Sequence, residues 1–151
     1  MLRDQINDAL KTAMKARDQR RVSTLRLINA AVQSADIETG GQGKAALADI
    51  EILGILQKMI KQRQESADIY EKAGRAELAA QERAEIEIIT AYLPKQMSDV
   101  EAGSAISAIL QEMNAEGMKD MGRVMAALKD RFAGKLDFAK ASAKVKELLK
   151  P

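Results

Sequence analysis

The chain has 151 residues, a net charge of +2, and neither cysteine nor histidine. These absences exclude a thiolate nucleophile, a disulfide, a zinc–thiolate site and an imidazole general base. Hydrophobic residues make up 46% of the chain and aromatic residues only 3%, and strong helix formers dominate. We therefore predict an all-α protein with an aliphatic core, and we expect no cofactor.

Apolar residues recur at helical spacing through the first 93 residues. They predict four helices, over about 2–17, 22–35, 48–73 and 75–93. The short break between the first two favours an antiparallel pair. Three glycines between residues 40 and 43 predict a flexible loop before the third helix. Residues 1–93 are therefore predicted to form a bundle of about four helices.

A stop and a restart follow within eight residues. Pro94 is the only internal proline, and its ring disfavours helix at the residue before it and removes an amide donor. Ser98 and Glu101 then match a capping box, with Ser at the N-cap and Glu three residues later. We predict a hinge marked by Pro94, Ser98 and Glu101, with residues 94–97 as a linker between two units.

Residues 98–151 predict three shorter helices. The first runs from Ser98 to about residue 117, and the second covers about 121–132, with Asp120 as its N-cap. Gly134 breaks the chain before a last helix over about 138–149. These elements predict a small three-helix unit, near the lower size for independent stability.

Positive charge is concentrated near the C-terminus. Residues 98–116 contain four acids and no base, whereas 117–151 contain nine bases and four acids. Such a local field attracts phosphate backbones, and a helix start with a glycine lets an anion approach its amides. The candidate RNA-binding residues are Lys119, Gly122, Arg123, Lys129, Arg131, Lys135, Lys140 and Lys144.

Two structural interpretations of this segment stay open. The lysines can simply solvate the outer face of a small bundle, and Gly122 can be a close helix-packing position. A second basic cluster lies in the first 26 residues: Lys11, Lys15, Arg17, Arg20, Arg21 and Arg26. Carboxylates between residues 65 and 87 can pair with neighbouring bases across helix turns, so we expect a solvated surface there and no metal site.

Six segments, in this order and spacing, resemble the YqeY-like family across essentially the whole chain. They are TLRLI (24–28), KQRQES (61–66), KAGRAEL (72–78), EIEIITAYLPKQMS (85–98), MGRVM (121–125) and GKLD (134–137). The family is similar to the C-terminal tail of the GatB component of aspartyl/glutamyl-tRNA amidotransferase. This resemblance implies a two-part all-α fold. The chain departs from the family pattern at Leu136 and Phe138, in a loop that is a candidate for RNA contact.

The resemblance implies a non-catalytic accessory module of translation that binds tRNA, mainly through residues 117–151. The tail helps to hold tRNA, so a family label of carbon–nitrogen ligase with glutamine as amido donor belongs to the larger enzyme. The alternative is a helical module that docks on an amidotransferase or another protein partner, because the helix ending at Leu93 is apolar on two sides.

We expect a soluble, cytoplasmic protein without a membrane partner. The charged N-terminus lacks the apolar core of a secretory signal. No run approaches the roughly 20 apolar residues of a membrane span. An independent amidase is disfavoured, because the chain lacks histidine, cysteine and a glycine-rich nucleotide loop.

Overall fold

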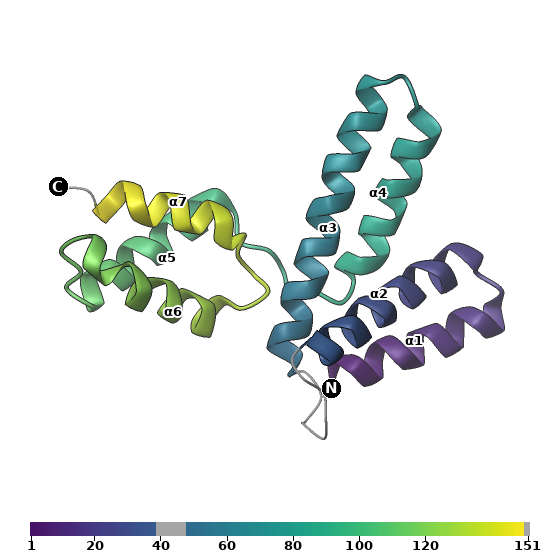
Figure 1. Ribbon diagram of the computed structural model, residues 1–151, viewed down its shortest axis with the longest axis horizontal. Coiled ribbons are helices and arrows are strands. Elements are labelled where there is room, and N and C mark those ends of the chain that lie inside the picture. The colour runs from purple at the N-terminus through teal and green to yellow at the C-terminus, as the bar shows by residue number, and fades with distance from the viewer. Residues whose placement is uncertain (39–47, 150–151) are drawn as a thin grey trace. The chain divides into compact units, whose positions relative to one another are not determined.

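A computed structural model describes residues 1–38 and 48–149 (Figure 1). These residues form seven α-helices and one 3₁₀ turn, and they contain no strand, which confirms the prediction of an all-α protein. The predicted glycine loop before the third helix lies outside the described residues. The chain divides into two compact units, Met1–Leu93 and Pro94–Pro151.

The N-terminal unit consists of two helical hairpins (Figure 1). Helix α1 (Leu2–Ala16) pairs with α2 (Gln19–Glu38), and α3 (Asp49–Lys72) pairs with α4 (Ala76–Thr90). Helix α2 also packs against α4 and joins the hairpins. The four helices predicted for this region are present, although α4 ends three residues earlier than expected.

An aliphatic core holds the N-terminal unit together. All four helices contribute to its ten buried residues: Leu2, Ile6, Ala13, Leu25, Ile28, Val32, Ile52, Leu56, Met59 and Ile89. Ile88, Tyr92 and Leu93 are partly buried against the same cluster. Both apolar sides of the helix that leads to Leu93 therefore contact the core of this unit, at least in part.

The C-terminal unit contains three short helices that all pack against one another. They are α5 (Asp99–Glu112), α6 (Met121–Phe132) and α7 (Phe138–Leu149), and a 3₁₀ turn, η1 (Met118–Asp120), precedes α6. Their buried cluster comprises Ile106, Ile109, Val124, Leu128, Leu136, Ala141, Val145 and Leu149. Leu136 lies in the predicted loop between α6 and α7, but its side chain is buried in this core and is not exposed for contact with RNA.

The segment around the proline is fastened to the C-terminal unit. The capping box is present: the Ser98 hydroxyl accepts the Glu101 amide at 3.1 Å, and the Glu101 carboxylate accepts the Ser98 amide at 3.0 Å. The Gln96 side-chain amide donates to the Gly134 carbonyl at 2.5 Å. The Met97 amide donates to the Lys135 carbonyl at 2.9 Å. Most of the predicted linker is therefore part of the C-terminal unit.

Candidate nucleic-acid interface

The eight predicted RNA-binding residues all lie on the surface of the C-terminal unit. They come from η1, α6, the connection between α6 and α7, and α7 itself. They are Lys119, Gly122, Arg123, Lys129, Arg131, Lys135, Lys140 and Lys144. All eight residues are therefore accessible to solvent. The contacts of each basic side chain decide how much of the positive charge is available to a ligand.

Gly122 occupies the first turn of α6 and faces open space. A Cβ built on this residue meets no atom within 4 Å, and the residue is exposed. The interpretation of Gly122 as a close helix-packing position was therefore wrong. An exposed glycine in a first helical turn leaves the backbone there accessible to a bulky anion.

Asp120 differs from the cap that the sequence predicts. It occupies the N-cap position of α6, but its side chain makes no capping hydrogen bond. Its backbone is helical, with φ −91° and ψ −3°, whereas a capping residue is usually extended. One carboxylate oxygen instead accepts the Glu116 amide at 2.9 Å, and the other accepts Arg123 Nη2 at 2.7 Å.

These contacts give Asp120 a positioning role. The residue is only 7% exposed, so its charge requires partners. The Glu116 amide, and then the Arg123 guanidinium, hold the pKa of Asp120 below its ordinary value. Asp120 thereby fixes the loop before η1 and one end of Arg123. The sequence did not reveal this role, because aspartate is equally suited to capping a helix and to accepting an amide from the preceding loop.

Ion pairs divide the basic residues into two groups. Arg123 pairs with Asp120 at 2.7 Å, Arg131 pairs with Glu112 of α5 at 2.7 Å, and Lys144 lies 3.9 Å from Glu147. Within the described part of the chain, the remaining four basic residues have no ion-pair partner: Lys119, Lys129, Lys135 and Lys140. The free positive charge of the predicted set is therefore carried by lysines.

Carboxylates between residues 68 and 85 pair with bases, as predicted, and the pairs described next join two helices. Arg83 of α4 contacts Asp68 at 3.6 Å and Glu71 at 2.7 Å, both on α3. Arg63 of α3 contacts Glu85 of α4 at 2.9 Å. Residues 1–38 and 48–149 contain no group of three carboxylates that could hold a metal ion. None of the described helices is both long and apolar enough to span a membrane.

The match to a protein family covers nearly the whole chain. A family model described as Yqey-like protein matches residues 3–149. The chain belongs to the Yqey-like family. This membership agrees with the all-α fold and with the resemblance carried by the six sequence segments.

Several fungal proteins are similar to this Yqey-like chain. "Altered inheritance of mitochondria protein 41, mitochondrial" of Clavispora lusitaniae is 30% identical over 82% of the chain and 72% of its own length. The protein of the same name from Lachancea thermotolerans is 31% identical over 69% of the chain, a region that makes up 55% of that protein. An uncharacterized protein of Schizosaccharomyces pombe is 28% identical over 63% of the chain and 74% of its own length.

Most of the segments that carry the family resemblance serve the fold. Segment 24–28 on α2 buries Thr24, Leu25 and Ile28. Segment 61–66 on α3 supplies Arg63, the partner of Glu85. Segment 72–78 places Gly74, at a φ of 74°, in the turn between α3 and α4. Segment 121–125 differs, because it exposes Gly122 and Arg123, two of the predicted RNA-binding residues.

Proposed function

We propose that the chain is a non-catalytic accessory module of translation that binds tRNA through the basic surface of its C-terminal unit. The observation that carries this proposal is a set of four exposed lysines without ion-pair partners in the described residues. An unpaired lysine ammonium keeps its charge available for a phosphate. The choice of tRNA rests on the resemblance to the amidotransferase tail.

The first turn of α6 supports this proposal. Arg123 is held at one end by Asp120, yet its side chain is still 57% exposed. A guanidinium has five donors, so donors remain for a phosphate oxygen. Gly122 beside it adds no side chain that would block the approach. A positioned arginine and an open helix start together form a suitable phosphate contact.

The proposal assigns no chemical step to this chain. The sequence contains no thiol and no imidazole, the groups that most often act as nucleophile or general base. Amidation would be the work of a larger enzyme, with this chain as its accessory. If the purified protein alone amidated Glu-tRNA with glutamine as donor, this part of the proposal would fail.

A cytoplasmic location is part of the proposal. The fungal relatives, by contrast, bear a name that describes them as mitochondrial. Fractionation of cells that express the full-length protein, followed by immunoblotting of each fraction, tests this location directly. Recovery of the protein only in an organelle fraction would contradict it.

Binding of tRNA can be measured by filter binding at salt concentrations between about 50 and 200 mM. Affinity should fall steeply with salt, because phosphate contacts release counterions. The test variant replaces the four free lysines with glutamine: Lys119, Lys129, Lys135 and Lys140. We expect its salt slope, in log K against log salt, to be shallower by about 3 units, since each lost phosphate contact removes about 0.7 to 0.9.

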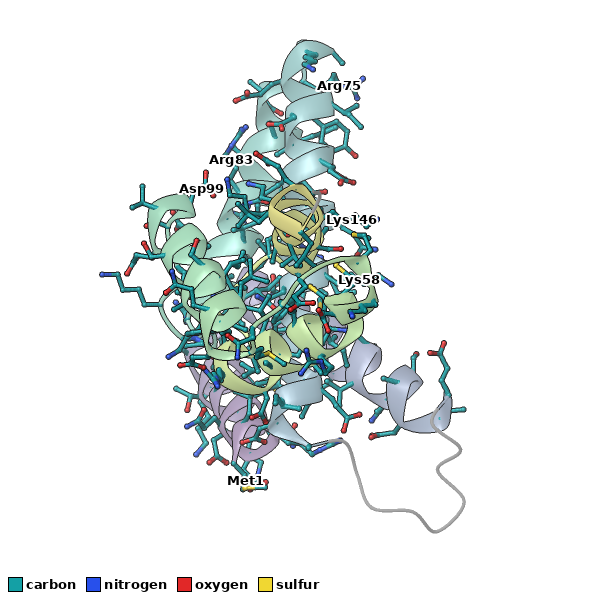
Figure 2. The ribbon with its side chains drawn as sticks, turned by 90° about the vertical axis from the view of Figure 1, so that its left-hand side faces the viewer. Met1, Lys58, Arg75, Arg83, Asp99 and Lys146 are labelled. Carbon is teal, nitrogen blue, oxygen red and sulfur yellow. The ribbon has the colours of Figure 1, made fainter. Side chains whose placement is uncertain are left out.

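A matched control removes the same charge from the N-terminal unit. It replaces four exposed bases of α3 and the α3–α4 turn with glutamine: Lys58, Lys61, Lys72 and Arg75. Figure 2 shows Arg75 at the end of that hairpin far from Met1. The control should keep the salt slope of the natural protein. Equal loss in both variants, or no tRNA binding at about 50 mM salt, would overturn the proposed function.

A further inference from the structure

The connection between α1 and α2 forms a tip at the end of the hairpin opposite the N-terminus (Figure 1). An open cavity of about 650 Å³ lies beside this tip. It is lined by three apolar and four polar residues: Met14, Val22, Leu27, Arg17, Gln19, Ser23 and Arg26. Its size falls within the range of ligand pockets, and the proposed tRNA surface does not include it.

Two large apolar side chains of this cavity face outward. Met14 is 50% exposed and Leu27 is 47% exposed, whereas Val22 packs against the core of the N-terminal unit. Neither Met14 nor Leu27 belongs to that core. Two exposed apolar residues that line one cavity form a patch rather than scattered exposure, and patches rimmed by polar groups are typical of binding sites.

The surroundings of the patch are strongly cationic. Residues 11–27 contain six bases and one acid, and all six bases are exposed. The acid, Asp18, is used locally: one oxygen accepts the Arg21 amide at 3.2 Å and the other lies 3.4 Å from Arg21 Nε. Neither Arg17 nor Arg26 has an ion-pair partner among the described residues, so both bring positive charge to the cavity itself.

The backbone at the tip is strained at a residue that lines the cavity. Arg17 has the left-handed conformation, with φ 57° and ψ 34°. Its amide donates to the Met14 carbonyl at 3.2 Å, and the Asp18 amide donates to the Ala13 carbonyl at 3.1 Å. These two bonds form a Schellman motif, in which this position is usually glycine because a Cβ is unfavourable there.

Two other helices of the protein end in the same motif with the residues that it prefers. Gly74 has a φ of 74° after α3, and Asn114 has a φ of 49° after α5. Each takes part in the same pair of amide-to-carbonyl bonds. Only at the tip does a long charged side chain take this position among the described residues. A strained residue at a cavity indicates a role beyond the fold.

We propose that this tip is a docking site for an acidic peptide segment of a partner protein. One or two bulky apolar side chains of the peptide contact Met14 and Leu27, and its carboxylates bind Arg17 and Arg26. Guanidinium groups bind carboxylates in bidentate geometry, and a methionine adapts to varied apolar partners. The site therefore selects an apolar anchor flanked by acids, through complementary charge and burial of the patch.

Charge alone would also suit RNA, but the floor of the cavity favours a peptide. No aromatic residue lines it, so it offers no platform for stacking bases. Contact with phosphates would leave Met14 and Leu27 in water, whereas an apolar anchor covers them. This inference is independent of the tRNA proposal, since the two surfaces lie in different units.

The test starts with selection of a random phage-displayed peptide library on the full-length protein. We expect enrichment of peptides in which leucine, isoleucine or phenylalanine is flanked by aspartate or glutamate. A synthetic peptide of the enriched sequence is then titrated by fluorescence anisotropy. Replacing its apolar anchor with alanine, or its acids with glutamine, should each weaken binding about tenfold or more.

Arg17→Gly is the decisive variant, because glycine relieves the backbone strain while removing the guanidinium. We expect its melting temperature to be unchanged or raised and its affinity for the peptide to fall about ten- to a hundredfold, as for loss of a charged hydrogen bond. Leu27→Ser should weaken binding through the apolar patch. Ile69→Ser, at another residue with an exposed side chain, is the matched control and should bind normally.

Three results would overturn this inference. One is the absence of any enriched acidic–apolar sequence. Another is equal binding of the selected peptide by the natural protein and by Arg17→Gly. The third is a loss of tRNA or phosphatidylglycerol-vesicle binding in Arg17→Gly and Leu27→Ser without any effect on peptide, which would assign the tip to phosphate chemistry. Failure of the tRNA proposal would appear separately, in the lysine variant.

Discussion

The two units connect their helices in different ways. In the N-terminal unit, charged side chains of one helix bind side chains of the next, and Asp49 of α3 also accepts the Leu2 amide of α1 at 3.2 Å. Arg3 of α1 binds Asp36 of α2 with two hydrogen bonds of 3.1 Å. Arg63 and Glu85 join α3 to α4, with their side chains only 14% and 13% exposed. The helices that these pairs join have 15 to 24 residues.

In the C-terminal unit, side chains mainly bind backbone groups at helix ends and loops. Glu101 and Ser98 cap α5, Asp120 holds the Glu116 amide, and Gln96 reaches the Gly134 carbonyl. Its helices have only 12 to 14 residues. Each helix leaves about four amides and four carbonyls unpaired, so short helices have proportionally more ends to satisfy. Substitutions of these side chains should therefore weaken contacts between helices in the N-terminal unit and contacts at helix ends and loops in the C-terminal unit.

The largest expected effect comes from truncating a buried side chain in the C-terminal core. Leu128 is fully buried, so Leu128→Ala should destabilise the C-terminal unit by about 2–5 kcal/mol through lost burial and a cavity. Hydrogen exchange resolved by mass spectrometry should show faster exchange in peptides from 94–149. The two tyrosines, Tyr70 and Tyr92, both lie in the N-terminal unit, so the thermal transition in tyrosine fluorescence should not move.

Leu25→Ala supplies the reciprocal control, because Leu25 is equally buried in the N-terminal core. It should lower the midpoint of the tyrosine transition while exchange in 94–149 stays slow. A common shift of both signals in either variant would show that the units unfold together, and the contrast between them would not extend to stability.

Much of this contrast could be predicted from local pattern. Helical spacing of apolar residues located all the helices, and the serine–glutamate spacing identified the capping box at Ser98 and Glu101. Both signals are short-range, so one sequence is sufficient. Helix ends were less accurate: α4 ends at Thr90 rather than near Leu93. Tyr92 and Leu93 pack on the core, but their amides donate to carbonyls three residues back, at 3.1 and 3.0 Å, and so form a turn rather than α-helix.

The contacts between distant residues could not be predicted. Nothing local shows that Arg131 meets Glu112 nineteen residues away. The shorter contact from Asp120 to the Glu116 amide could not be distinguished from a helix cap, because both use an aspartate at this position. Composition also could not show that Arg17, one of six bases in its cluster, has a left-handed backbone. The basic surfaces were therefore located by sequence, but which charges are paired, strained or free follows only from the three-dimensional structure.

A smaller difference in stability should distinguish a buried ion pair from exposed ion pairs within the N-terminal unit. Glu85→Gln leaves Arg63 largely buried without a charged partner, so we expect a loss of about 1–3 kcal/mol in the free energy of unfolding. Arg83→Gln removes ion pairs of the same two helices, but these are well exposed and should contribute at most about 1 kcal/mol. Urea unfolding followed by tyrosine fluorescence measures both. Equal losses of unfolding free energy in the two variants would contradict a role for burial of the Arg63–Glu85 pair.

The smallest expected effect is a loss of stability at low pH, and it should occur in the C-terminal unit. The pKa of Asp120 lies below its ordinary value of 3.8 because the Glu116 amide and Arg123 stabilise the carboxylate. The pKa of Glu101 lies below 4.5 because the Ser98 amide, and then the Ser98 hydroxyl, stabilise its carboxylate. A group whose pKa falls on folding gives stability that is complete above its unfolded pKa and is lost as the pH falls through the folded pKa.

The C-terminal unit should therefore keep the contribution of both carboxylates above pH 4.5 and lose it progressively below pH 3.8. The amide resonance of Glu116 reports on Asp120 directly, because this amide donates to its carboxylate. Its chemical shift should titrate with a midpoint below 3.8, and Asp120→Asn should abolish that titration and reduce the acid-dependent rise in exchange over 94–149. A midpoint at 3.8 or higher would mean that the contacts of Asp120 with the Glu116 amide and Arg123 do not favour the charged carboxylate. The backbone-directed contacts of this unit would then stabilise its loops without making them sensitive to acid.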